Sequence, residues 1–308
     1  MSGIGRAPKL GRLLTAMVTP FDERGRVDLR EAARLARWLI DEGNDGLVIA
    51  GTTGESPALT DDEKLALFRA TKEAVGDRAA IVANTGGNNT EHSIELTVRA
   101  EKEGVDAALV VVPYYNKPPQ DGMLRHFGAI AEATALPLIV YNIPGRTGVN
   151  MTAATQVELA RTHPNVVGVK ESSGDLAQMT AILHDRPSGF RLWSGDDHLL
   201  LPVLAIGGEG VVSVAAHLCA REMRRLVDAY VAGDVETAAR IHQELAALTA
   251  ALFATTSPIP VKWALNRIGF ACGDCRSPLG AMPDATAALL EPMLAPYRER
   301  VRDTALTG

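Results

Sequence analysis

The chain has 308 residues, 46% of them hydrophobic and 22% charged, which is the balance of an ordinary globular protein and excludes a mainly disordered or collagen-like chain. Its 37 acidic and 31 basic side chains give a net charge of −6, so it lacks the basic surface that nucleic-acid binding needs. At about 150 residues per domain the length suggests two domains, but one α/β barrel with an appendage fits equally well.

The start of the chain is polar and has no apolar segment, so we expect no secretory signal there. No apolar run approaches the roughly 18 residues of a membrane span, and we expect no membrane association. The three cysteines are too few for a disulfide framework, which favours a reducing compartment. We therefore expect a cytoplasmic protein.

Eight short apolar runs recur along the chain, and an amphipathic stretch follows each of them. The runs are rich in Val, Ile and Leu and do not alternate with polar residues, as is typical of strands buried on both faces of a parallel sheet. We predict strands at 13–18, 46–50, 80–83, 107–112, 138–142, 166–170, 190–193 and 210–214.

The stretches between these runs have helical periodicity and recognisable ends. Asp28-Leu-Arg-Glu31 and Thr60-Asp-Asp-Glu63 are capping-box sequences, and Gly43 stands where a glycine commonly ends a helix. Strand–helix alternation repeated about eight times predicts a (β/α)8 TIM barrel. The alternative, a doubly wound open sheet, would need a nucleotide-binding glycine loop after its first strand, and the sequence has none there. The other helices are expected at 91–102, 122–133, 153–162, 176–184 and 198–206.

The strand signal disappears from about residue 220 onward, and the rest of the chain has the pattern of helices. We divide the chain into a (β/α)8 catalytic barrel, residues 1–225, and a C-terminal helical region, residues 226–308. No low-complexity linker separates the two, so we expect the helical region to be packed on the barrel. Its helices are expected at 222–231, 235–253, 261–268 and 285–297.

A barrel of this kind has its active site at the carboxyl ends of the strands, so the residues that follow the apolar runs are the candidates. Lys170 ends the run 166–170. A lysine inside the barrel loses hydration, which favours the neutral amine that attacks carbonyl carbons. The alternative is a structural lysine paired at the strand end, for instance with Glu171.

Two other strand ends carry polar side chains, one after the run 46–50 and one at the end of the run 138–142. The turn Gly51-Thr-Thr-Gly-Glu-Ser56 can point backbone N–H groups at a small anion, or it can be a plain tight turn. Tyr141 can act as a general acid or base if another hydroxyl relays its proton, or it can be a core aromatic with its hydroxyl at the rim. Arg146 can bind a carboxylate through two hydrogen bonds, or it can be a solvated loop residue.

Two patterns permit a metal or redox interpretation, which we reject. Cys272-Gly-Asp-Cys275 has no second pair of the kind that a zinc site needs. Asp196, Asp197 and His198 resemble a metal site, but we expect the two acids to cap the helix that starts there. The sequence has no nucleotide-binding, metalloprotease or calcium-loop motif. We therefore predict no metal and no organic cofactor.

In order along the chain, the motifs G-T-T-G-E, Y-N-I-P-x-R-T-G and G-V-K-E resemble those of the dihydrodipicolinate synthase / N-acetylneuraminate lyase family of Schiff-base lyases. The likeness extends from residue 15 to residue 264. Within the family it favours the members that condense pyruvate with L-aspartate 4-semialdehyde in the diaminopimelate/lysine pathway, as homotetramers built from two dimers. The alternatives are a related aldolase or dehydratase of 2-keto-3-deoxy sugar acids, or an inactive carboxylate sensor. Arg146 and Tyr114-Tyr115-Asn116 argue against the sugar acids.

The resemblance also implies roles for individual residues. Lys170 is expected to form a Schiff base with pyruvate. Tyr141 is expected to be the proton donor and acceptor, and Thr52 and Tyr115 would complete its relay, with Tyr115 reaching in from a neighbouring subunit. The residues expected to bind substrate carboxylates are Thr53 and the Val212 backbone for pyruvate and Arg146 for L-aspartate 4-semialdehyde.

The chain departs from the pattern of the lysine-inhibited members of this family. Those members carry two histidines and a glutamate at positions that here are Asp61, Lys64 and His92. Asn88 and Tyr114 fit the pattern, but Lys64 places positive charge where a cationic effector would bind. We expect feedback inhibition by lysine to be weak or absent.

Overall fold

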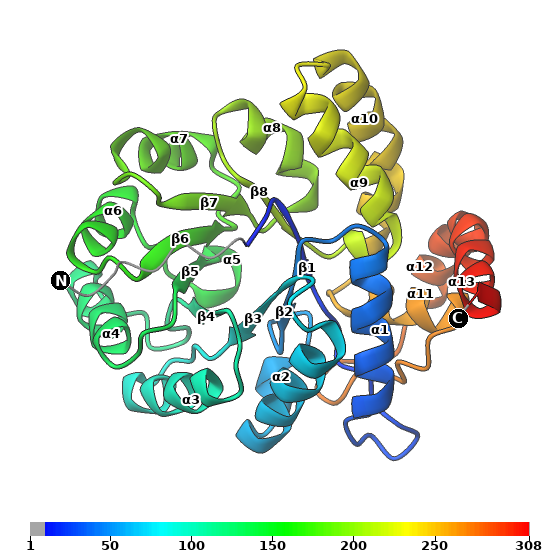
Figure 1. Ribbon diagram of the computed structural model, residues 1–308, viewed down its shortest axis with the longest axis horizontal. Helices are drawn as coiled ribbons and strands as arrows, with labels where there is room; N and C mark the ends of the chain where they lie inside the picture. The colour runs from blue at the N-terminus through cyan, green and yellow to red at the C-terminus, as the bar shows by residue number, and fades with distance from the viewer. Residues whose placement is uncertain (1–9, 308) are drawn as a thin grey trace.

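Eight parallel strands form a closed barrel in the computed structural model, which describes residues 10–307 (Figure 1). Each strand pairs with its neighbours in chain order, and β8 closes the barrel onto β1. The predicted (β/α)8 barrel is confirmed, with strand ends that differ from expectation by no more than two residues. The strands are β1 Leu13–Ala16, β2 Gly46–Ile49, β3 Ala80–Asn84, β4 Ala107–Val111, β5 Leu138–Asn142, β6 Val166–Glu171, β7 Arg191–Ser194 and β8 Gly210–Ser213.

Successive residues of each strand face opposite sides, and both sides are buried. Leu14, Val48 and Trp193 belong to a small apolar cluster contributed almost entirely by the strands, which fills the barrel interior. Leu13, Leu47 and Leu192 belong to the larger core between the strands and the surrounding helices. This two-sided burial explains why the strands are continuous apolar runs in the sequence.

The helices that alternate with the strands begin and end close to the expected positions. The capping box at the start of α2 is formed, because Thr60 and Glu63 each accept a hydrogen bond from the other's backbone N–H. At α1, Asp28 caps the helix as expected, but Glu31 accepts hydrogen bonds from Ala271 N and Arg34 instead. The helices are α1 Leu29–Asp41, α2 Asp61–Val75, α3 Thr90–Lys102, α4 Gln120–Glu132, α5 Pro144–Thr147, α6 Ala153–Thr162, α7 Leu176–Asp185 and α8 Leu200–Ala205.

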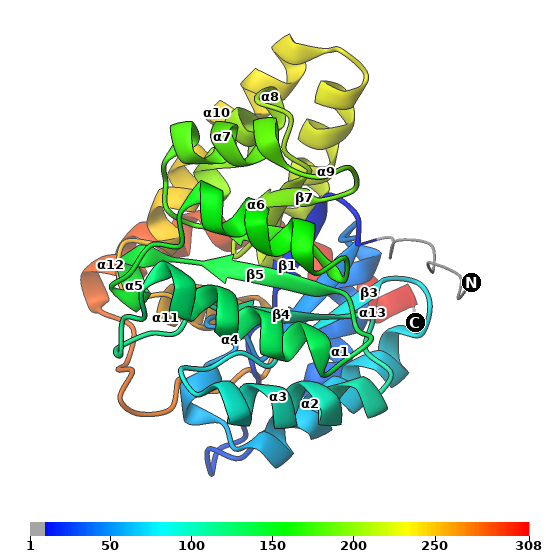
Figure 2. The same ribbon diagram turned by 90° about the vertical axis from the view of Figure 1, so that its left-hand side faces the viewer.

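The C-terminal part of the chain is helical and packs on one side of the barrel, beside α1 (Figure 1). The boundary between the barrel and the helical region, placed between residues 225 and 226, stays a proposal. It falls within α9. In Figure 2, α5 and α11 lie at the same end of the barrel. The helices are α9 Ala216–Val231, α10 Val235–Leu252, α11 Ile259–Ile268, α12 Asp284–Leu290 and α13 Ala295–Thr307.

None of the helices within residues 10–307 is long and apolar enough to cross a membrane. The polar segment of residues 1–9, on which the expectation of no secretory signal rests, lies outside the described residues.

Candidate active site

Lys170 and Tyr141 meet at the carboxyl ends of two neighbouring strands. They are register partners on β6 and β5, and their side chains are only 5% and 4% exposed. The ammonium nitrogen of Lys170 lies 4.1 Å from the centre of the Tyr141 ring. Within the described residues Lys170 forms no hydrogen bond and no ion pair. The alternative in which Lys170 pairs with Glu171 is therefore wrong, and the amine is available to a ligand.

Glu171 points away from Lys170 because adjacent strand residues face opposite sides. Its carboxylate is fully buried and accepts hydrogen bonds from Asn142 Nδ2 at 2.9 and 3.0 Å, Gln156 Nε2 at 2.9 Å, Gln178 Nε2 at 3.1 Å and Ser173 N at 2.9 Å. Each of these donors is neutral. The network ties the end of β5 to the end of β6, and so it holds the two strand ends that carry the tyrosine and the lysine.

Sequence reasoning missed this network, although a signal for it existed. Asn142 and Glu171 are the polar residues that directly follow Tyr141 and Lys170, and they are also register partners. Two polar side chains at the same level of neighbouring buried strands must hydrogen-bond to each other or to a third group, because a buried polar group without a hydrogen bond lowers the stability of the fold.

Gly195, at the end of β7, leaves room for Lys170. A Cβ atom at this position would lie 2.9 Å from Lys170 Cε and 1.8 Å from Ser172 Oγ. The Ser172 hydroxyl is itself buried and has no hydrogen-bond partner among residues 10–307. Next along the chain, burial raises the pKa of Asp196, and electrostatic interactions with His198 and Lys170 oppose that shift.

Thr52 and Arg146 both line one cavity, of about 540 Å³, at the carboxyl ends of the strands, and Lys170 and Tyr141 are not among its lining residues. Asn84, Val111 and Tyr114 line it as well. Arg146 is exposed, and its guanidinium makes one long contact of 3.5 Å with Ser257 O. The cavity is thus lined by an exposed cation and by a threonine, which suits a substrate with a carboxylate.

The remaining predicted site residues are buried or lie outside this cavity. Thr53 is 5% exposed, and Val212, on β8, belongs to the same interior cluster as Tyr141. Tyr115 is 89% exposed and has a positive φ of 72°. It forms no hydrogen bond within the described residues. Its expected place in a relay depends on a neighbouring subunit and stays a prediction.

The three residues that depart from the lysine-inhibited pattern also lie at this cavity. Asp61, Lys64 and His92 all line it. His92 Nε2 lies 2.7 Å from the carboxylate of Asp61. Lys64 is 7% exposed, and burial lowers its pKa while Asp61 opposes the shift.

Asp197 is engaged differently from expectation. It accepts hydrogen bonds from Ser213 Oγ, Val214 N and Ala215 N, between β8 and α9, and does not cap the helix that follows it. The first N–H of α9, at Ala216, donates to Ser213 Oγ. Asp196 makes no capping bond to the helix after Asp197 either. The expectation was wrong because the chain continues from Asp197 into a short 3₁₀ turn, and the side chain turns to the buried N–H groups at the end of β8.

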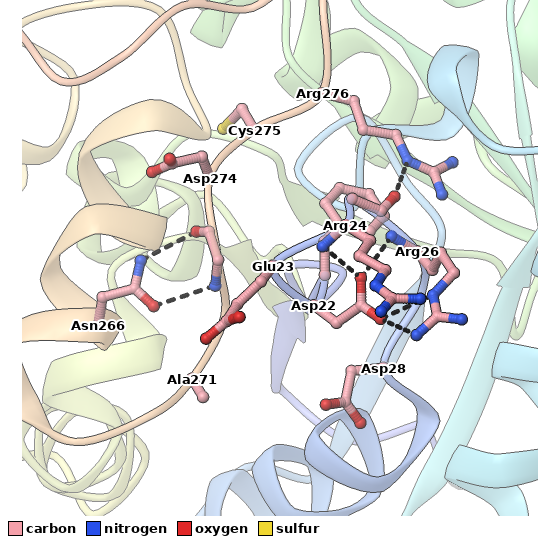
Figure 3. Close-up of a pocket in the computed structure, with 13 residues that line it drawn as sticks. Asp22, Glu23, Arg24, Arg26, Asp28, Asn266, Ala271, Asp274, Cys275 and Arg276 are labelled. Carbon is pink, nitrogen blue, oxygen red and sulfur yellow. Dashed lines mark hydrogen bonds and ion pairs between the residues drawn. The ribbon is translucent and has the colours of Figure 1, made fainter.

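A larger cavity, of about 890 Å³, lies between the loop after β1 and the loop after α11, and its polar groups largely pair with each other (Figure 3). Arg26 pairs with Asp22, and Arg276 Nε donates to Gly25 O. Burial raises the pKa of Cys275, which lines this cavity, and of the nearby Cys272 to about 12. Such thiols are protonated at neutral pH and are therefore weak nucleophiles. The described residues contain no group of three or more His, Cys, Asp or Glu side chains that could hold a metal.

The fold and the cavity at the strand ends define a (β/α)8-barrel enzyme. A protein-family model described as the dihydrodipicolinate synthetase family matches residues 9–294. The chain belongs to this family, as its motifs led us to expect.

Relatives and solved structures agree with this assignment. The chain is 57% identical to a 4-hydroxy-tetrahydrodipicolinate synthase of Moorella thermoacetica, over 87% of this chain and 92% of that protein. It is 46% identical, with a TM-score of 0.91, to the lysine-bound DHDPS of Cyanidioschyzon merolae, over 92% of this chain and 96% of the other. The dihydrodipicolinate synthase of Acinetobacter baumannii in complex with pyruvate has 37% identity and a TM-score of 0.89, over 92% and 98% of the two chains.

Proposed function

We propose that the chain condenses pyruvate with L-aspartate 4-semialdehyde, the reaction of a 4-hydroxy-tetrahydrodipicolinate synthase, through a Schiff base on Lys170. The names of relatives that are 57% and 48% identical over 87% and 94% of the chain confirm the expected synthase function. The observation that carries the Schiff-base mechanism is the buried amine of Lys170, which has no ion pair in the described residues and lies against the ring of Tyr141.

The reaction begins when the neutral amine of Lys170 attacks the carbonyl carbon of pyruvate and water leaves. The resulting protonated imine withdraws electrons, so that a methyl proton departs and an enamine forms. Tyr141, with Thr52 and Tyr115 as its relay, transfers these protons. The barrel interior around Lys170 is apolar, which keeps water away from the imine.

The second half of the reaction joins the two substrates. The enamine carbon attacks the aldehyde carbon of L-aspartate 4-semialdehyde, whose carboxylate binds Arg146, while Thr53 and the Val212 backbone hold the carboxylate of pyruvate. The amine of the second substrate then attacks the imine carbon, which closes the ring and releases Lys170. The exposure of Arg146 in the cavity that contains Thr52 supports its role. This sequence of steps needs no metal and no organic cofactor.

The assembly that we propose is a homotetramer, a dimer of dimers, in the cytoplasm. The high exposure of Tyr115, despite its bulk and apolar ring, supports its contact with a neighbouring subunit.

The proposal is tested by steady-state turnover with pyruvate and a panel of aldehydes. L-aspartate 4-semialdehyde, glyceraldehyde and N-acetylmannosamine are compared by kcat/KM, with the cyclic product detected through a coupled reductase. We expect a preference of several orders of magnitude for L-aspartate 4-semialdehyde, and Arg146→Ala should remove most of it. Turnover with sugar aldehydes alone would contradict the proposal.

A further inference from the structure

A buried ion pair joins the C-terminal helical region to the turn that carries Thr52 and Thr53. Lys262 Nζ, on α11, lies 2.7 Å from Glu55 Oε1, and both side chains are 1% exposed. The two residues are 207 positions apart in the chain. Such a pair is costly to bury, so its presence calls for a role beyond stability.

Both members of this ion pair make further contacts, a hydrogen bond to Glu55 and a cation–π contact of Lys262. Glu55 Oε2 accepts a hydrogen bond from Arg276 N at 2.8 Å. The Lys262 ammonium and the Arg276 guanidinium lie 3.9 and 4.3 Å from the centre of the Phe21 ring. Arg276 also donates to Ala58 O at 2.7 Å and pairs with Glu63 at 2.6 Å. Two segments of the C-terminal region therefore hold the chain from Glu55 to Glu63.

The turn that they hold is unusually constrained. Glu55 has a φ of 58°, a left-handed conformation that non-glycine residues adopt only when their surroundings enforce it. Its N–H donates to Thr52 O at 3.1 Å, so Glu55 and Thr52 are ends of one tight turn. On the other side, Thr19 Oγ1 donates to Gly54 O at 2.7 Å. Because these hydrogen bonds hold the four-residue turn from Thr52 to Glu55, a shift of the Glu55 carboxylate would also move Thr52.

We propose that Glu55 and Lys262 are positioning residues, through which α11 fixes the Thr52–Thr53 turn in its catalytic geometry. The inference rests on the proposed function, in which Thr52 relays a proton and Thr53 holds the carboxylate of pyruvate. Neither member of the ion pair lines the cavity that contains Thr52. Their effect on the reaction passes through the backbone of the turn.

The experiment separates positioning from stability with a double substitution. Breaking a buried pair on one side leaves an unpaired charge, whereas replacing both members by neutral residues of similar volume is often tolerated. Glu55→Gln and Lys262→Met are made singly and together, and each variant is measured for Tm, kcat and the KM for pyruvate. We expect the double variant to recover most of the Tm lost by Lys262→Met, while kcat stays at least tenfold lower and the KM for pyruvate at least tenfold higher than in the parent.

A matched control removes a different buried carboxylate. Glu42 is 2% exposed and pairs with Arg221 at 2.6 Å and Arg300 at 3.0 Å, which ties α9 and α13 to the end of α1, at the opposite end of the barrel. Glu42→Gln should lower Tm and leave kcat and KM within about twofold of the parent.

Parental kinetics in the double variant would overturn the positioning role, and so would an equal kinetic loss in Glu42→Gln. Glu55→Gln alone, which hardly changes the side-chain volume, carries the test if the double variant does not fold. A parent enzyme that fails to turn over L-aspartate 4-semialdehyde would instead refute the proposed function, so the two failures are distinguishable.

Discussion

Gly195→Ala tests whether the space beside Lys170 is required for activity. The added Cβ would lie 2.9 Å from Lys170 Cε and 3.1 Å from Ser172 Cβ, whereas ordinary contacts begin near 3.4 Å. The lysine must therefore move by about 0.5 Å, and the Ser172 hydroxyl, at 1.8 Å, by much more. Overpacking of this kind costs about 1–3 kcal/mol of stability. Because misplacing a reacting group by about 1 Å can lower the rate ~100-fold, we expect kcat/KM to fall roughly 10- to 100-fold.

The assay compares kcat/KM with the rate at which borohydride traps the pyruvate adduct, so that Schiff-base formation is measured separately from condensation. Both rates should fall in Gly195→Ala. Ser172→Gly in the same background removes the closest clash but not the contact with Lys170, so it should recover stability more than rate. A folded Gly195→Ala variant with the parental trapping rate would refute the reasoning.

Three further predictions concern His217, Lys64 and Glu171. The buried ring of His217 accepts a hydrogen bond from Val18 N, and burial lowers its pKa from 6.5 to about 4. The unfolded chain thus binds a proton between these pH values and the native chain does not. His217 alone should therefore lower the free energy of unfolding by on the order of 3 kcal/mol from pH 6.5 to pH 4, and a His217→Asn variant should lose this share in urea titrations. The share of His126, whose pKa burial also lowers to about 4, should remain. Because Lys64 lines the cavity that Thr52 and Arg146 also line, we expect lysine to inhibit only above the submillimolar range, and a submillimolar inhibition constant would contradict this. Glu171→Gln places an amide N–H₂ group, a hydrogen-bond donor, among four neutral donors. Tm and kcat should both fall, because buried donors lose their acceptor. An unchanged kcat would show that the network does not hold the lysine.

Much of the barrel could be predicted because its signals are local. Strands buried on both faces are apolar at every position, and the capping residues Asp28 and Thr60 act within three residues of themselves. The strand-end rule then limits the candidate site to a few turns. It placed Lys170 and Tyr141 next to each other, as the register of β5 and β6 shows.

The parts that could not be predicted depend on partners far along the chain. Asp197 accepts hydrogen bonds from backbone N–H groups that directly follow β8, and Glu31 accepts one from a residue 240 positions away. The Lys262–Glu55 pair joins residues 207 positions apart. A lysine within the apolar stretch 259–265 was nevertheless a signal that its charge needs a buried partner. Tyr115 depends on another subunit, which one chain does not contain.

The central claim is that Lys170 is the nucleophile, and borohydride reduction in the presence of pyruvate tests it most directly. Peptide mass analysis of the reduced protein should find one reduced pyruvate adduct, located on the peptide that contains Lys170 and absent from a Lys170→Ala variant. An adduct on another lysine, such as Lys64 or Lys262, or no adduct in an enzyme that turns over, would contradict the mechanism.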